Sequence, residues 1–209
     1  MSTITQKIVK RIRGKQRGWV FAPRDFLDIG SRASIDKTLS RLTAKGIIRR
    51  LGRGVYDFPK KHNVLGLLSP SAQNIARAAA SKRVNKVISS GATAANKLGL
   101  STQIAAKPTF VTNEATRKKK IGGQTVVFKR TKVPVIENIS DLANLTLQAL
   151  VHLGKKNIDE PTIIRCANVL TKRDIKKLMA HLDQTPSWLA DAIHRIKREK
   201  EDGSICKKS

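Results

Sequence analysis

The stretch from Gly30 to Pro59, GSRASIDKTLSRLTAKGIIRRLGRGVYDFP, constrains the fold more than any other part of the sequence. Ser31 is a good N-cap, because its hydroxyl can accept hydrogen bonds from the free amides of a first helical turn. The apolar positions that follow recur at helical spacing and predict one buried stripe: Ile35, Thr38, Leu39 and Leu42. Gly46 is suited to end this helix, because the residue after a helix often adopts left-handed dihedrals that glycine reaches at little cost.

Two short β-like runs follow this helix. Residues 47–51 and 55–58 carry β-branched and aromatic side chains and flank a Gly-Arg-Gly tip. Pro59 ends the second run, since proline has no amide to donate to a β-ladder. A helix followed at once by a tight basic hairpin is typical of a winged helix-turn-helix. The alternative is a small helix-plus-hairpin core with an ordinary solvated face.

The residues before Gly30 complete the winged-helix order. Apolar residues at i, i+4 and i+8 predict a first helix within residues 2–13: Ile4, Ile8 and Ile12. Ser2 or Thr3 can cap this helix, and a basic turn and a short apolar strand follow it. Pro23 opens a second predicted helix over residues 24–29, because proline is well tolerated at a first helical position. We therefore expect a winged helix-turn-helix domain over residues 1–61.

The face of the third predicted helix opposite the apolar stripe has short or cationic side chains, which allow a phosphate backbone to approach closely. An α-helix fits the DNA major groove, and the second helix of a helix-turn-helix normally supplies the base contacts. The basic hairpin is suited to lie along phosphates. The predicted DNA-contacting residues are Arg32, Ser34, Lys37, Ser40 and Arg41 on the helix, Arg49, Arg50 and Arg53 on the hairpin, and Arg17 in the turn after the first helix.

The remaining chain predicts a mixed α/β domain over residues 62–136 and a helical region over residues 137–201 that forms one unit with it. A polar joint at 60–63 and an apolar run at 64–68 begin this part. The further predicted elements are helices at 71–81 and 91–98, strands at 84–89, 108–112, 118–121 and 125–129, and helices that begin near 142, 159, 171 and 185. Thr171 and Asp174 resemble a capping box. Residues 202–209 form a charged tail, and the fold class is α+β.

A basic β-ribbon is predicted around the Gly122-Gly123 turn. Its cationic residues are Arg117, Lys118, Lys119, Lys120, Lys129 and Arg130. They form either a second patch that contacts phosphates or a solvated hairpin.

The net charge of +27, from 42 Lys and Arg against 15 Asp and Glu, points to a polyanionic partner. Residues 1–61 alone contain 16 Lys and Arg against four Asp. A membrane surface is the weaker alternative, because the cations are spread over the chain. No apolar run is long enough to span a membrane, and no signal-peptide core is present. Two isolated cysteines, Cys166 and Cys206, indicate neither a disulfide framework nor a zinc site, and we expect a cytoplasmic protein.

The sequence does not favour an enzyme, and we expect neither a cofactor nor a metal. Between Asp57 and Glu114 there is no Asp or Glu, and the later carboxylates are scattered, whereas a metal-dependent nuclease needs them clustered. The four histidines show no metal-ligand spacing. No phosphate-cradling glycine motif occurs.

Three segments together resemble the AbiEi-like antitoxins and transcriptional regulators of type IV toxin–antitoxin systems: WVFAPRDF, SRASIDKTLSRLTAKGIIRRLGRGVYDFP, and ISSGATAANKLGL with the hairpin after it. They cover roughly residues 1–133. The resemblance implies a bacterial protein whose winged helix binds inverted repeats in its own promoter. It further implies that a C-terminal domain acts against a nucleotidyltransferase-like toxin.

We therefore expect a sequence-specific repressor that binds double-stranded DNA and is the autoregulating antitoxin of its operon. A basic RNA-binding or ribosome-associated protein is the first alternative, and a nuclease is a more distant one.

Overall fold

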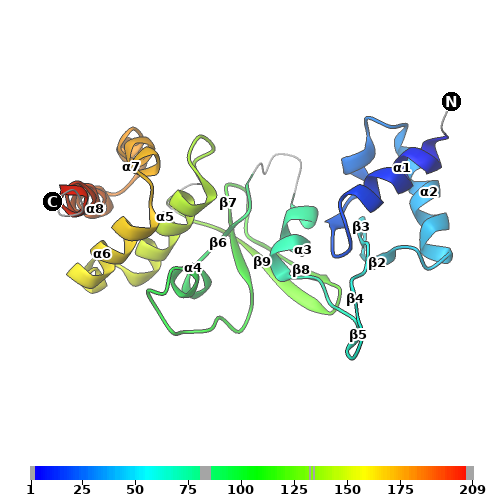
Figure 1. The fold of residues 1–209 in the computed structure, drawn as a ribbon, viewed down its shortest axis with the longest axis horizontal. Helices are drawn as coiled ribbons and strands as arrows, with labels where there is room; N and C mark the ends of the chain where they lie inside the picture. Colours follow the sequence, from blue (N-terminus) through cyan, green and yellow to red (C-terminus); the bar gives the residue numbers. More distant parts are fainter. Residues whose placement is uncertain (1–2, 81–85, 132, 134, 206–209) are drawn as a thin grey trace. The chain divides into compact units, whose positions relative to one another are not determined.

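A computed structural model describes residues 3–80, 86–131, 133 and 135–205, and the chain divides into two compact units (Figure 1). The first unit comprises Met1–Arg83 and Lys118–Val126, and the second comprises Val84–Arg117 and Val127–Ser209. The structure is mixed α and β, with a helical C-terminal region, as predicted. The predicted boundary after residue 61 lies inside the first unit, because later segments pack against the elements that precede them.

The first unit begins with the elements that the sequence predicts before Pro59. In chain order they are α1 (Ile4–Gly14), β1 (Val20–Phe21), the 3-10 helix η1 (Pro23–Phe26), α2 (Arg32–Ala44), β2 (Arg49–Gly52) and β3 (Val55–Asp57). The three strands form an antiparallel sheet of order β1-β3-β2. Val20 of β1 and Arg49 of β2 are both in register with Asp57, which places Asp57 on the central strand.

The predicted limits of α2 are confirmed. The Ser31 hydroxyl accepts from the Ser34 amide at 3.3 Å, and Gly46 follows the helix at a φ of +67°. The predicted stripe is buried, because α2 packs on α1 and η1 around a common apolar core. That core consists of Ile8, Ile12, Phe21, Phe26, Ile35, Leu39, Leu42, Ile48 and Tyr56.

The predicted α-helix over residues 24–29 is wrong in type. One 3-10 turn forms instead, and the Asp25 carboxylate closes it by accepting from the Ala22 amide at 2.8 Å. The chain then turns at Gly30, where a Cβ would lie 3.1 Å from the Ile4 side chain of α1. This close approach leaves little room for a side chain at position 30.

A hairpin that the sequence did not predict follows the sheet. Residues expected to form a polar joint and an apolar run pair as β4 (Lys61–His62) and β5 (Gly66–Leu67). Gly66 has a φ of +69°, a conformation that side chains disfavour and that closes this tight connection. Helix α3 (Ala72–Ala79) comes next, capped by Ser71, and packs against β1 and β3.

Residues 118–126 belong to the first unit because they are bonded to it at several points. The Gly122 amide donates to the Leu51 carbonyl at 2.9 Å, and the Gln124 side chain donates to the Pro70 carbonyl at 3.1 Å. The Lys119 ammonium donates to the Ala79 carbonyl at 2.8 Å, at the C-terminal end of α3. The Arg24 guanidinium binds three further carbonyls at this end, those of Arg77, Ala78 and Ala80. A helix C-terminus favours such cations, because its last carbonyls lack partners within the helix.

The second unit combines a sheet with a helical bundle. Its elements are β6 (Ile88–Ser89), α4 (Ala92–Lys97), β7 (Thr109–Thr112), α5 (Asp141–Leu153), η2 (Lys155–Asn157), α6 (Glu160–Val169), α7 (Lys172–Met179), η3 (Leu182–Gln184) and α8 (Ser187–Ile205). The residues of strands β8 (Arg117–Ile121) and β9 (Gln124–Arg130) are divided between the two units: 118–126 are assigned to the first, and Arg117 and 127–130 to the second. In the described part of the chain the strand order is β6-β7-β9-β8, with β7 and β9 parallel.

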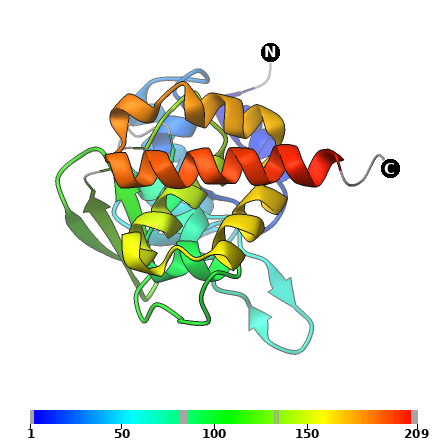
Figure 2. The ribbon, with the colours of Figure 1, turned by 90° about the vertical axis from the view of Figure 1, so that its left-hand side faces the viewer.

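The four predicted C-terminal helices are confirmed, and α8 packs against α6 and α7 (Figure 2). Helix α8 extends through Ile205, four residues past the expected end at 201, so residues 202–205 of the predicted tail are helical. The rest of that tail lies outside the described residues, as do residues 84 and 85 of the predicted strand at 84–89. Cys166 of α6 is buried in the bundle core, and this burial raises the pKa of its thiol to about 12.

The predicted capping box of α7 is present. The Thr171 hydroxyl accepts from the Asp174 amide at 3.1 Å, and the Asp174 carboxylate accepts from the Thr171 hydroxyl at 2.6 Å and its amide at 3.1 Å. Burial acts to raise the pKa of the Asp174 carboxyl. Hydrogen bonds from the hydroxyls of Thr171 and Ser140 and from the Thr171 amide outweigh it, so the pKa lies below its ordinary value.

Replacing Asp174 with Asn should lower the free energy of unfolding of the second unit by about 1 kcal/mol at pH 7, because the charged half of the capping box is lost. The folded pKa is depressed, so this contribution is complete above about pH 4 and disappears as the pH falls through the folded value. Urea unfolding followed by Trp188 fluorescence in a Trp19→Phe background measures it. Asp191→Asn, at an exposed position on α8, is the control. A difference between Asp174→Asn and the parent that stays constant down to pH 2 would contradict this account.

Candidate nucleic-acid interface

The exposed face of α2 carries the cationic and small side chains that the sequence places there. Since the stripe around Ile35 and Leu39 is buried, the opposite face is solvent-exposed. The predicted contact residues on it are exposed Arg32, Lys37, Ser40 and Arg41 and half-buried Ser34. Arg32 forms an ion pair with Asp36 at 2.8 Å. Within the described residues, Lys37 and Arg41 have no ion-pair partner, so their charges remain available to an anionic ligand.

The β2–β3 hairpin divides its three arginines between two roles. Arg50 and Arg53 are exposed, with Arg53 at the tip beside Gly54, whose φ is +69°. Arg49 lies inward and forms a two-point ion pair with Asp57, through Nη2–Oδ2 at 2.6 Å and Nε–Oδ1 at 3.1 Å. The Asp57 side chain is 1% exposed, and its hydrogen bond raises the pKa of Arg49. Arg49 is therefore an anchor within the fold rather than an open cation.

Arg17 lies in the turn after α1, as predicted, and is held against the strand end. Its guanidinium lies 4.9 Å from the centroid of the Phe58 ring and donates to the Pro59 carbonyl at 3.2 Å. The residue remains exposed. Contacts of this kind restrict the rotamers of a long side chain while its charge still faces solvent.

A groove of about 640 Å³ connects the end of α1, the end of α2, the β2–β3 hairpin and the β4–β5 hairpin. Its wall includes four exposed cations, which define what we call the basic groove: Arg13, Arg17, Arg50 and Lys61. Arg13 and Lys61 were not among the predicted contact residues. The density of Lys and Arg in residues 1–61 was the signal for them, but only the fold shows which of these residues share a wall.

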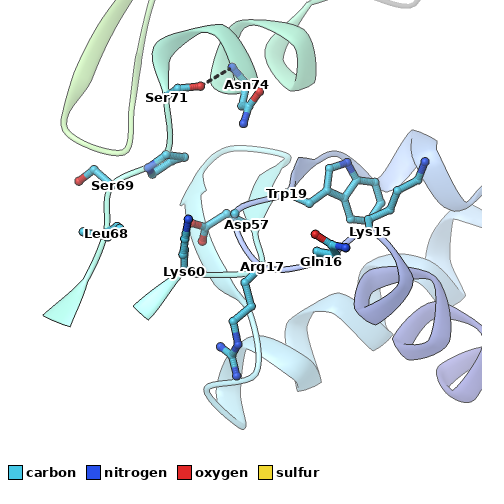
Figure 3. Close-up of a pocket in the computed structure, with 12 residues that line it drawn as sticks. Lys15, Gln16, Arg17, Trp19, Asp57, Lys60, Leu68, Ser69, Ser71 and Asn74 are labelled. Atoms are coloured by element: carbon cyan, nitrogen blue, oxygen red, sulfur yellow. Dashed lines mark hydrogen bonds between the residues drawn. The ribbon is translucent and has the colours of Figure 1, made fainter. Parts of the chain in front are cut away.

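A neighbouring hollow of about 450 Å³ has a different character (Figure 3). Lys15, Trp19 and Lys60 line it together with the Asp57 carboxylate, and Ser71 and Asn74 lie at its α3 side. The Asn74 amide donates to the Ser71 hydroxyl, so the first turn of α3 is already capped. The basic groove adjoins the end of α2 at Thr43 and includes Arg50, so it is the better site for an anion that also contacts α2.

The six cations of the second predicted basic patch differ in their contacts. Arg117 is half-buried, pairs with Glu114 and lies 4.9 Å from the centroid of the Phe128 ring. Lys119 is bonded to the end of α3, as described above. The other four cations of the set are exposed: Lys118 and Lys120 in the first unit and Lys129 and Arg130 in the second. Arg117 and Lys119 thus support the fold, and only the other four present charge without a described partner.

Carboxylates and histidines do not gather into a metal centre in the part of the chain that the structure describes. Among the described helices, none is long and apolar enough to cross a membrane.

Replacing Arg49 with Met should destabilise the first unit by about 3 kcal/mol, because the buried Asp57 carboxylate loses its partner. Arg50→Met, at the adjacent exposed position, should change stability by no more than about 0.5 kcal/mol. Urea unfolding followed by Trp19 fluorescence in a Trp188→Phe background measures both. The double variant Arg49→Met/Asp57→Asn leaves no unpaired charge and should recover part of the loss. Equal effects of the two single variants would contradict the anchoring role of Arg49.

Comparisons with known proteins give a family without an assigned activity. A family of unknown function (DUF6088) matches residues 7–178. Among solved structures, the chain is similar to the RV2827C protein from Mycobacterium tuberculosis, with 13% identity and a TM-score of 0.44 over 96% of this chain and 78% of that one. A comparison with curated proteins gives no match.

Proposed function

We propose that this chain, which belongs to the DUF6088 family of unknown function, binds duplex DNA and represses transcription. In this proposal α1, η1, α2 and the β1-β3-β2 sheet form a winged helix-turn-helix, with α2 as the recognition helix and the β2–β3 hairpin as the wing. The observation that carries it is the exposed face of α2, on which Lys37 and Arg41 lie beside small side chains and form no ion pair with any described residue.

The dimensions of α2 suit this role. Its 13 residues span about 20 Å, and a helix of ordinary diameter enters the major groove of B-DNA. Ala33, Ser40 and Ala44 are exposed on the same face, so the helix axis can approach the base edges closely. Lys37 and Arg41 are one helical turn apart and can donate to guanine or to phosphate.

The hairpin and the basic groove supply the phosphate contacts in this proposal. Arg50 and Arg53 are exposed on the β2–β3 hairpin, and Arg13, Arg17 and Lys61 continue the positive charge along the groove. Contacts of this type fix a protein on a duplex without reading its sequence.

Lys37→Ala and Arg41→Ala should each weaken binding to a cognate duplex by about 5- to 150-fold, equivalent to ~1–3 kcal/mol, if the side chain reads a base. Fluorescence anisotropy with duplexes from the region upstream of the chain's own reading frame measures this. Arg50→Ala and Arg53→Ala should weaken all duplexes alike and lower the slope of log affinity against log salt by ~0.9 per lost phosphate contact.

Arg173→Ala, at an exposed position on α7, is the matched control and should leave affinity unchanged. Unchanged affinity in both α2 variants would overturn the assignment of α2. Equal affinity of the parent chain for structured RNA and for every duplex would favour a charge-driven RNA-binding protein instead. Metal-dependent cleavage of the probe that Glu114→Gln abolishes would favour a nuclease.

The resemblance to AbiEi-like regulators supports a narrower form of the proposal, in which the repressor is the autoregulating antitoxin of its operon. A promoter–reporter fusion tests the autoregulation, because Lys37→Ala should release repression. Co-expression with a neighbouring nucleotidyltransferase-like protein tests the antitoxin role, because the chain should relieve the growth inhibition that this protein causes.

A further inference from the structure

The β4–β5 hairpin exposes apolar side chains at its tip. Val64 is 86% exposed and Leu65 is 71% exposed, and Leu67 on the returning strand is 57% exposed. The hairpin extends away from α1 and α2 of its own unit in both ribbon views (Figures 1 and 2). Adjacent large apolar side chains on a projecting element commonly mark a binding site.

The hairpin holds this tip in a defined conformation. Its strands pair Lys61 with Leu67 and His62 with Gly66. The Nδ1 atom of His62 accepts from the amides of Val64 and Leu65, at 3.2 and 3.3 Å. The tip is therefore organised before any ligand binds, which reduces the entropy lost on binding.

The base of the hairpin is joined to the anchored part of the sheet. The Leu68 amide donates to the Lys60 carbonyl at 2.8 Å, and the Leu68 carbonyl accepts from Arg49 Nη2 at 2.9 Å. Arg49 is the same residue that pairs with Asp57. The tip is thus coupled through one side chain to the β2–β3 hairpin.

Positive charge lies at the base of the hairpin, on the side of the basic groove. Lys60 and Lys61 are exposed at the base of the hairpin, and Lys61 and Leu67 both line that groove with Arg17 and Arg50. The sequence contains no carboxylate between Asp57 and Glu114. An apolar tip whose base carries cations is complementary to a nucleic acid, in which apolar stacked bases lie behind a charged phosphate backbone.

We propose that the β4–β5 hairpin is an apolar wedge for duplex DNA, and this rests on the DNA-binding function proposed above. Val64 and Leu65 enter the minor groove beside the segment that α2 contacts and insert between two base pairs. Aliphatic side chains inserted in this way partly unstack a base step and kink the duplex. Flexible pyrimidine–purine steps are therefore the preferred sites of insertion.

The test uses the full chain, a duplex of about 40 base pairs that it binds, and two readouts. Energy transfer between dyes at the duplex ends reports bending, and 2-aminopurine placed at successive steps reports unstacking. The parent chain should raise both signals, with 2-aminopurine responding at a single step. Val64→Ala/Leu65→Ala should abolish both signals and weaken binding by roughly tenfold or less, with the salt slope unchanged because no phosphate contact is lost.

Two matched variants separate the wedge from loss of apolar surface. Leu65→Met keeps a flexible apolar side chain of similar volume and should retain the bend. Ile104→Ala removes an apolar side chain that is 89% exposed in the second unit and should change neither signal. Circular dichroism of each variant confirms that the fold is kept.

The outcomes distinguish the wedge from the proposed function. Binding by the parent chain without bending or unstacking overturns the wedge and leaves DNA binding intact. Failure of the parent chain to bind any duplex overturns both. Bending that persists in Val64→Ala/Leu65→Ala, together with loss of self-association in sedimentation, would assign the tip to contact with a second copy of the chain.

Discussion

The buried carboxylate of Asp57 is the constraint on which the basic surface of the first unit depends. A carboxylate out of water requires a paired and hydrogen-bonded cation, and Arg49 provides it from the neighbouring strand. The same guanidinium binds the Leu68 carbonyl at the base of the next hairpin. One ion pair therefore fixes how β2, β3 and β4–β5 present their exposed residues. Arg50, Arg53 and Lys61 do not contact Asp57, yet their positions follow from it.

The positively charged residues of the chain do not all face a ligand, because some of them bind groups within the fold. Arg24 and Lys119 bind carbonyls at the end of α3, and Arg117 is enclosed with Glu114 and Phe128. Arg24 and Lys119 stabilise the fold by binding carbonyls that would otherwise lack partners. Lys37 and Arg41, in contrast, make no described ion pair. Sequence counts cannot separate the two classes, because the separating feature is a carbonyl or ring brought close by distant parts of the chain.

Local signals carried most of what could be predicted from the sequence. Ser31, Gly46 and the Thr171–Asp174 capping box are each decided within four residues, and each is confirmed. The β4–β5 hairpin was missed because its connection lacks an Asn-Gly or Asp-Gly signal and its apolar residues face solvent. The inward turn of Arg49 and the role of Lys119 were missed for another reason: their partners lie 8 and 40 residues away in the chain. Exposure of the α2 face was predictable because helical periodicity alone determines it.

The membership of residues 118–126 in the first unit has a practical consequence for cutting the chain. A recombinant fragment that stops near residue 83 omits the strand residues that cover Gly52 and bond to Leu51, and it strips Lys119 from the end of α3. A fragment that stops at residue 61 also loses α3 itself. Apolar surface of β1 and β3 would then face water, and such pieces would aggregate for reasons unrelated to their ligand. Dissection of this protein by truncation therefore requires residues 118–126 to be grafted back through a linker.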